Sequence, residues 1–245
     1  MIIDIDFLNK RIKGDFMCKP LEKLFGKSAE YLLDTYSDKY SYPIDIVKMI
    51  NKIGGISLGS KNFSDLDEIL SKDGSRAHVI GAVRVLDDGV QIIYADSLDK
   101  EKDVEHPNIT QEQKQEKLMR RQRFTIAHEL AHCCLHIDAN QKKNYIELRS
   151  ENIGIEDENK EKLANIFAGE LLMPRPVIDA FVLNPQKYGV AIGNEISVRQ
   201  MADAFLVNNH TMCERLRYLR NNDGLYAGAV FNTSGIPGMG ECLDG

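Results

Sequence analysis

The chain has 245 residues, 43% of them hydrophobic and 28% charged, which is typical of a globular protein with a substantial core. Its net charge of -6 argues against coating nucleic acid, which needs a basic face. Five cysteines in no paired spacing indicate a reducing compartment. The sequence has neither an apolar run of the ~20 residues that a membrane span needs nor a secretory leader pattern. We therefore expect a cytoplasmic protein.

The N-terminal part of the chain gives few signals. Residues 1–40 form a lysine-rich extension in which Ser28–Leu33 indicates one short helix. Pro43 occupies the favoured first position of a second helix, with apolar residues at helical spacing, and Gly54-Gly55 ends it. Ile56–Leu58 is expected to be a short strand.

A hairpin and a long helix are predicted next. Two β-branched runs, Val79–Leu86 and Val90–Tyr94, flank Asp87-Asp88-Gly89, a strong hairpin signal. After a polar stretch, Thr110 and Gln113 match a capping box. The helix that they begin is predicted to run on into the segment after residue 120.

That segment, Arg123–His132, contains the pattern His-Glu-x-x-His. On a helix, His128 and His132 lie one turn apart on one face, so both imidazoles can bind one tetrahedral Zn²⁺. Glu129 can then act as general base toward a water that the metal activates. The alternative is an amphipathic helix whose histidines only satisfy the core, and a third ligand decides between the two interpretations.

Neighbouring candidates in the same helix are weaker. His136 extends the series but is rotated about 80° from His128, so it fits better as a histidine favoured by the helix C-terminus. Cys133 and Cys134 are adjacent, and adjacent helix residues point about 100° apart, so they are poor candidates for a shared metal.

The third ligand is expected on a second helix that Pro174 and Pro176 end near Met173. Three acids compete, namely Glu158, Glu161 and Glu170. Glu170 lies on the opposite face from Glu161, and Glu158 lies in the first turn. Glu161 shares its face with small residues that permit close packing on the histidine helix. Asn165, at i+4 from Glu161, is placed to hydrogen-bond the far nitrogen of a ligand histidine. Glu161 is therefore the predicted ligand.

The C-terminal part predicts more helices. A short amphipathic piece at Val177–Leu183 precedes a helix capped by Ser197, a turn near 207–209 and a helix to Leu219, which is helix-turn-helix spacing. Over residues 194–223 four arginines balance four acids, namely Arg199, Arg215, Arg217 and Arg220 against Glu195, Asp203, Glu214 and Asp223. This zero net charge favours a helical layer that packs on the core or docks a protein over DNA reading. The glycine-rich residues 224–245 are expected to be loosely ordered.

The two motifs together resemble the ImmA/IrrE family of bacterial zinc metallopeptidases. They are Arg-Phe-Thr-Ile-Ala-His-Glu-Leu-Ala-His and the later Glu-x-x-Ala-Asn-x-Phe-Ala-x-Glu-Leu-Leu-Met-Pro, and the resemblance extends over about 41–221. It implies Zn²⁺ on His128, His132 and Glu161, with Glu129 as catalytic base. It also implies a cytosolic protein substrate, because members typically cut a helix-turn-helix repressor, often encoded beside them on mobile elements.

The expected fold is α+β and zincin-like, with a small, partly antiparallel sheet on the two motif helices and extra helices at both ends. The expected division is an extension at 1–40, a catalytic domain at 41–193, helix-turn-helix-like helices at 194–223 and a tail at 224–245. In zinc peptidases of this build an edge strand holds the substrate backbone. Either the hairpin does so here, or its strands only cover the core.

Two other functions remain open, a non-catalytic zinc-stabilised binding module and a DNA-binding regulator. The presence of Glu129 favours the enzyme, because a structural zinc needs no base. The neutral C-terminal helices make direct nucleic-acid binding the weaker alternative. Tyr145 and Arg149 are candidates for stabilising an oxyanion, although nothing in the sequence fixes either.

Overall fold

A computed structural model describes residues 21–37, 41–63, 79–86, 89–97, 110–135, 146–150, 155–223, 226, 228–234 and 236. Its helices are α2 (Leu21–Tyr36), α3 (Ile46–Ile53), α5 (Gln111–Leu135), α6 (Ile155–Leu172), α7 (Arg175–Leu183), α8 (Val198–Phe205) and α9 (Asn209–Asp223). Its strands are β1 (Ile56–Lys61), β2 (Val79–Val85), β3 (Val90–Ala95), β4 (Ile146–Ser150), β5 (Ala191–Ile192), β6 (Glu195–Ser197) and β7 (Phe231–Asn232). This is the α+β class predicted from the sequence.

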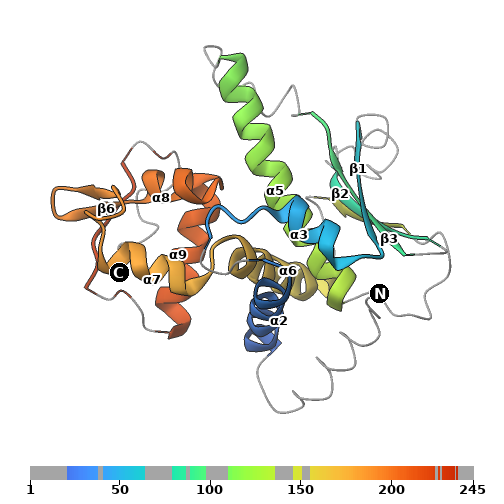
Figure 1. Cartoon of the computed structure of the whole chain (residues 1–245), viewed down its shortest axis with the longest axis horizontal. Coiled ribbons are helices and arrows are strands. Elements are labelled where there is room, and N and C mark those ends of the chain that lie inside the picture. Colours follow the sequence, from blue (N-terminus) through green and yellow to red (C-terminus); the bar gives the residue numbers. More distant parts are fainter. Residues whose placement is uncertain are drawn as a thin grey trace.

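The long helix α5 separates two parts of the molecule (Figure 1). The four-stranded sheet lies on one side of it, and α7, α8, α9 and the three-stranded sheet lie on the other. Helix α6 occupies the centre and packs against α5, α2 and α9. Both motif helices are therefore central elements of the fold.

The four-stranded sheet has the order β1-β3-β2-β4, with β1 parallel to β3 and β2 antiparallel to both neighbours. The predicted hairpin is confirmed as β2 and β3. Gly89 in its turn has φ 156, and a Cβ there would lie 2.2 Å from the carbonyl oxygen of Gly55, so the close approach requires glycine. Both hairpin strands are interior, and β1 and β4 are the edges among the described strands. Since neither hairpin strand is an edge of this sheet, the edge-strand role left open for the hairpin does not apply to it.

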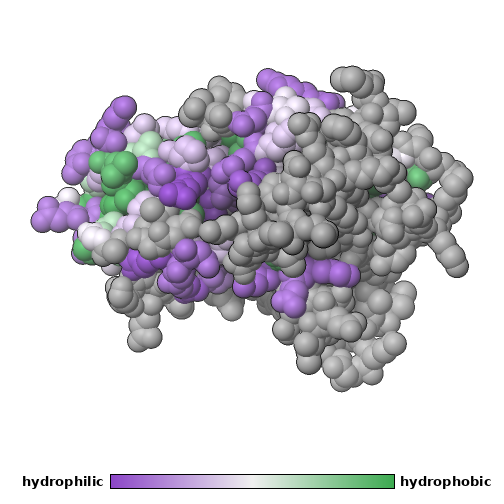
Figure 2. Space-filling model, turned by 90° about the horizontal axis from the view of Figure 1, so that it is seen from below, coloured by the Kyte–Doolittle hydropathy of each residue, from purple (hydrophilic) through white to green (hydrophobic). Residues whose placement is uncertain are grey.

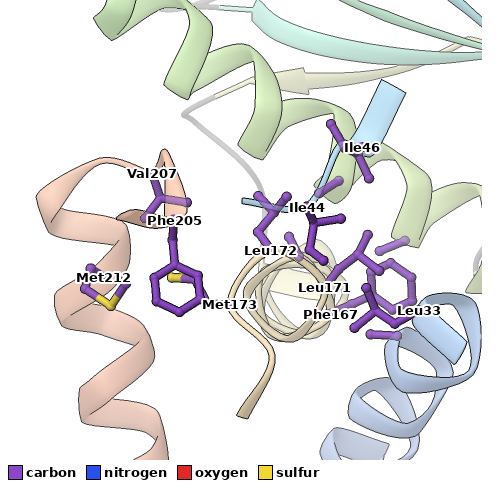
Figure 3. Close-up of a cluster of buried hydrophobic side chains, with 14 of the residues drawn as sticks. Leu33, Ile44, Ile46, Phe167, Leu171, Leu172, Met173, Phe205, Val207 and Met212 are labelled. Carbon is purple, nitrogen blue, oxygen red and sulfur yellow. The ribbon is translucent and has the colours of Figure 1, made fainter. Parts of the chain in front are cut away.

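Helix α2 is longer than the predicted helix at Ser28–Leu33. Its residues Ala29, Leu32 and Leu33 are buried in the main core, and Figure 3 places Leu33 beside Phe167 of α6. This packing outweighs the cost of about 1 kcal/mol that Gly26 brings to a helix interior. The segment at 21–36 therefore belongs to the same core as the motif helices.

The start of α3 corrects a prediction. The helix begins at Ile46, because the Asp45 carboxylate accepts a hydrogen bond from the Lys48 backbone N–H at 2.9 Å. A side-chain acceptor at this position satisfies a helix donor that has no partner within the helix, which Pro43 cannot do. Pro43 thus lies before the helix. The predicted end is confirmed, with Gly54 as the C-cap.

Helix α5 begins as predicted. The Thr110 backbone N–H donates to Gln113 Oε1 at 2.9 Å, and the Gln113 N–H donates to Thr110 Oγ1 at 3.2 Å, which is a complete capping box. The helix then continues without a break through the histidine motif. The side chain of Gln122 fastens it to the sheet by donating to the Ala95 carbonyl oxygen at 2.9 Å.

The C-terminal helices are docked on α5. Ser197 caps α8 by accepting from the Gln200 N–H at 3.3 Å, as predicted. At the other end of α8, Arg120 of α5 donates to the Val207 carbonyl at 2.8 Å and Arg123 donates to the Leu206 carbonyl at 3.2 Å. Two guanidinium groups thus meet the negative end of a helix, which is a favourable arrangement.

The segment after residue 224 differs from the loosely ordered end that the sequence suggested. Its described part forms β7, which pairs in parallel with β6. The Tyr226 hydroxyl donates to the Asp179 carboxylate of α7, and Arg220 donates to the Ala229 carbonyl at 3.0 Å. Side-chain hydrogen bonds that periodicity does not reveal therefore hold this part of the chain in place.

Buried side chains at the end of α6 join the two parts of the molecule. Figure 3 shows Leu171 and Leu172 facing Ile44, while Met173 faces Phe205.

At the surface, large exposed hydrophobic residues include Leu183, Ile192 and Val230. Figure 2 shows hydrophobic surface at the end of the molecule that carries β6 in Figure 1. None of the described helices is long and apolar enough to cross a membrane.

Candidate metal centre and active site

The two histidines of the motif lie inside the molecule, where α5 meets α6. His128 is 0% exposed and His132 is 3% exposed. Ala164 and Ala168 of α6 are fully buried, and their small side chains allow the two helices to approach closely. The predicted small-residue face of α6 is thus the face that packs toward the histidines.

Three potential ligand atoms converge at this helix junction. The Nε2 atoms of His128 and His132 are 2.9 Å apart, and they lie 3.0 and 3.1 Å from the two carboxylate oxygens of Glu161. Ligand atoms of a tetrahedral zinc with bonds of about 2.05 Å lie about 3.3 Å apart, so the observed separations are close to that spacing. Among the described residues, these three form the group of ligand side chains suited to a metal ion.

Asn165 orients the first histidine. Its Oδ1 lies 2.9 Å from His128 Nδ1. Because a carbonyl oxygen only accepts, Nδ1 donates to it, and Nε2 is the ring nitrogen that faces Glu161 and His132. A neutral imidazole with its proton on Nδ1 binds a metal through Nε2. Asn165 thus lies where the sequence analysis placed it, one helical turn after Glu161.

The electrostatics of Glu161 favour a charged ligand. Burial alone raises the pKa of its carboxyl, but hydrogen bonds and charge interactions with His128 and His132 outweigh burial and hold the pKa well below its usual range. Two buried imidazole nitrogens and one partly buried carboxylate form a donor set whose negative charge a divalent cation would neutralise. The residues present therefore fit a metal such as zinc.

Glu170, one of the two competing acids, does not join this group. The carboxylate of Glu170 lies on the opposite face of α6, where it pairs with buried Arg215 and accepts from the Arg175 backbone N–H at 3.1 Å. Glu158 belongs to α6, but its side chain is outside the described residues. Glu170 therefore caps α7 and anchors α9.

Glu129 occupies a different face of α5 from the histidines. Its side chain is 1% exposed and lies against strand β2. A Cβ at Gly81 of β2 would come within 2.5 Å of Glu129 Oε1 and 2.6 Å of Thr125 Cγ2. Gly81 was not among the site residues predicted from the sequence. A glycine inside a β-branched run is the signal that marks such a close approach.

Other sequence candidates are less informative. Cys133 and Cys134 are buried, and burial raises the pKa of the Cys134 thiol to about 12, which makes thiolate ligation unfavourable. His136 and Tyr145 lie outside the described residues, as does the side chain of Arg149. The two oxyanion candidates therefore stay predictions.

Comparison with known proteins agrees with this geometry. The model of the Peptidase_M78 family, described as the IrrE N-terminal-like domain, matches residues 89–217. This match covers just over half of the chain, including both motif helices, and it begins within the hairpin rather than near Ser41. No curated protein was found to be similar to the chain. The chain therefore belongs to the IrrE N-terminal-like peptidase family, and its α+β architecture is the zincin-like fold of that family.

Proposed function

We propose that the protein is a zinc-dependent endopeptidase that cleaves a peptide bond in a partner protein. The observation that carries the proposal is the convergence of His128, His132 and Glu161, with Glu129 next to His128 on α5. Membership of a peptidase family supports hydrolysis. A zinc-stabilised binding module would need the three ligands, but it would not need a buried carboxylate next to them.

Each residue of the site has its own role in the proposed hydrolysis. His128, His132 and Glu161 would hold the zinc ion, which when bound supplies Lewis-acid chemistry that acidifies water and polarises a carbonyl group. Glu129 accepts the proton of the attacking water and then donates it to the nitrogen of the leaving amine. Asn165 keeps His128 in the ligating tautomer through their 2.9 Å hydrogen bond.

The proposed substrate is a helix-turn-helix repressor, as in the resembled family, and its cleavage would relieve repression in the cytoplasm. The substrate backbone would be held by the edge strand β4, whose outer side has no strand partner among the described residues. A peptide segment added to this edge would be extended, as a peptidase requires of the bond it cleaves. A helix-turn-helix repressor encoded next to this gene would be the first substrate to assay.

Replacing the proposed base tests the mechanism. Glu129→Gln should keep both the fold and one bound zinc per chain, since Glu129 is not one of the three converging ligand residues. Cleavage of the partner repressor should fall by about 10²–10⁴-fold, the usual loss when a general base is removed. Rates are measured by following the full-length repressor on denaturing gels, and zinc is measured by mass spectrometry.

Two controls make the outcome decisive. Glu112→Gln changes an exposed carboxylate in the first turn of the same helix and should cleave at the wild-type rate. Glu161→Ala should lose both zinc and cleavage. If Glu129→Gln cuts as fast as wild type, the base assignment is wrong. If zinc-loaded wild-type protein binds the repressor but never cuts it, the binding-module alternative replaces the peptidase.

A further inference from the structure

We propose that Gly81 of β2 is a positioning residue that fixes the carboxylate of Glu129. Because position 81 has no side chain, the Glu129 carboxylate can lie directly against the backbone of β2. The contact between Glu129 and the backbone at position 81 follows from the geometry alone. Its effect on catalysis rests on the function proposed above.

The contact is close enough to exclude any larger residue. A Cβ at position 81 would lie 2.5 Å from Glu129 Oε1 and 3.1 Å from its Cδ. Non-bonded carbon atoms pack at about 3.5–4.0 Å, so an alanine here would need the carboxylate or the strand to move by close to 1 Å. Because a Cβ stands about 1.5 Å from its Cα, the Gly81 Cα itself lies within about 4 Å of Oε1. Glycine thus brings the backbone into direct contact with the carboxylate.

The pleat of β2 points position 81 at α5. Val83, two residues on, is buried in the main core together with Ile126 and Leu130 of α5. Ala82, between them, packs on the other face of the sheet with Phe63. Side chains alternate along a strand, so position 81 shares the α5 face with Val83. A side chain at this position has no other direction to take.

The pairing of β2 with its two neighbouring strands holds the backbone at Gly81 in place. Gly81 pairs with Tyr94 of β3 on one side and with Arg149 of β4 on the other. The register with β4 also shifts between Val79 and Gly81, and such irregularities re-aim a strand next to a site. A strand hydrogen-bonded on both sides yields less readily than a carboxylate that can rotate. We therefore expect the Glu129 side chain to move when position 81 carries a methyl group.

The atoms nearest to this contact do not belong to the metal ligands. The Cβ built at position 81 meets Thr125 and Glu129 as its nearest neighbours, and none of His128, His132 or Glu161 is among them. Zinc affinity and base placement therefore respond separately to a change at Gly81. This separation distinguishes a positioning role from general damage to the site.

The first test compares two glycines of one sheet. Gly81→Ala should lower kcat by about 10²-fold, the loss typical of a 1 Å misplacement, with KM and zinc content nearly unchanged. The matched control is Gly59→Ala in β1, where the new Cβ meets only the flexible end of Gln91, at 3.1 Å. It should leave all three quantities as in wild type. A Gly81→Ala protein with wild-type kcat overturns the inference, as does one whose rate falls only because zinc is lost.

A second test removes the structural part of the clash. Thr125→Ser deletes the Cγ2 methyl group that a Cβ at position 81 would meet at 2.6 Å, so Gly81→Ala/Thr125→Ser should fold even if Gly81→Ala does not. If the Thr125 clash alone matters, this double variant regains wild-type kcat, which overturns the inference. If the displaced carboxylate matters, kcat stays low. Adding Glu129→Asp then costs less than it does in wild type, because the shorter side chain withdraws from the methyl group.

The third test does not depend on activity. Urea midpoints are measured on metal-free protein in the Thr125→Ser background, for Gly81→Ala with either Glu or Ala at position 129. Gly81→Ala should shift the urea midpoint less when residue 129 is Ala than when it is Glu. The effect of the new alanine on the unfolded chain is the same in both backgrounds, so it cancels in the comparison. Equal midpoint shifts in the two backgrounds would mean that position 81 does not contact the Glu129 carboxylate, which overturns the inference. A protein that shows the coupling yet cuts no peptide bond refutes only the proposed peptidase.

Discussion

Asn165 illustrates how one exposed residue can control a buried ligand. It lies on α6 at the protein surface, while the histidine that it contacts is fully buried. Its Oδ1 fixes which ring nitrogen of His128 carries the proton, and thereby frees Nε2 for the metal. Without this acceptor, the imidazole would sample the other tautomer and other ring orientations, and zinc binding would have to reverse both.

We therefore expect Asn165→Ala to weaken zinc binding by about 10–100-fold, the usual cost of losing the partner of a ligand histidine. Asn165→Asp should bind nearly as well as wild type, because it keeps an acceptor oxygen. Competition with a chromogenic chelator measures the affinity. Asn159→Ala, also exposed on α6, is the control and should be neutral. Wild-type affinity in Asn165→Ala would mean that the hydrogen bond does not orient His128.

At this scale the sequence predicts what helical periodicity determines. His128 and His132, and likewise Glu161 and Asn165, are four residues apart on single helices, so their shared faces follow from 3.6 residues per turn. Gly81 and Glu129 come from different elements, 48 positions apart in the sequence. Their contact depends on how a sheet packs on a helix, which periodicity does not encode.

Among the elements, α6 and α9 are joined by a buried ion pair. Arg215 of α9 is 4% exposed and Glu170 of α6 is 7% exposed. The guanidinium also donates from Nε to the Met173 carbonyl at 3.3 Å, at the end of α6. From the sequence alone, Glu170 was a candidate metal ligand and Arg215 belonged to the helix-turn-helix-like segment that could have read DNA. One interaction between helices that are distant in the sequence accounts for both residues.

Removing one partner of this pair should be costly. Arg215→Met leaves the Glu170 carboxylate buried with less compensation, so the free energy of unfolding should fall by about 3–5 kcal/mol. Urea denaturation measures the change. The control Arg217→Met breaks the pair of Arg217 with Glu214, both far more exposed, and should cost about 0–1 kcal/mol. A loss of similar size in both variants would show that the buried pair does not anchor α9.

Local signals also predicted some element ends but not others. The capping box of Thr110 and Gln113 was predictable because both partners lie within three residues. At α3 two local signals competed, and the Asp45 side chain set the start in preference to Pro43. The strand β7 could not be predicted, because β6, with which it pairs among the described strands, is more than 30 residues away and each strand is very short.

At the scale of the whole molecule, three arginines attach the C-terminal helices to the two helices of the metal centre. Arg120 and Arg123 reach from α5 to the carbonyl oxygens after α8, and Arg215 reaches from α9 to α6. Helices α8 and α9 also pack on each other. A protein bound to these helices would therefore stand at a fixed position relative to the metal centre, which is how a substrate-presenting surface would work.

In this arrangement, arginine side chains that DNA binding would need are engaged within the protein. Arg215 is buried in its pair with Glu170, and Arg220 donates to the carbonyl groups of Tyr226 and Ala229. Arg217 is paired with Glu214. Even non-specific DNA binding draws its free energy from lysine and arginine side chains that displace counterions from phosphates. Three of the four arginines of the helix-turn-helix-like segment thus have partners within the protein, and four acids balance the charge of all four.

We accordingly predict that the protein does not bind DNA through α8 and α9. A gel-shift titration at low salt, where electrostatic binding is strongest, should show no retarded band at micromolar protein with either random DNA or the operator of the partner repressor. The sharpest contrary result would be nanomolar, sequence-specific binding that disappears in Arg199→Ala/Arg217→Ala, a variant that leaves the buried Arg215 intact. That result would assign these helices to DNA, and the site for the protein substrate would then have to lie elsewhere, beside the edge strand β4.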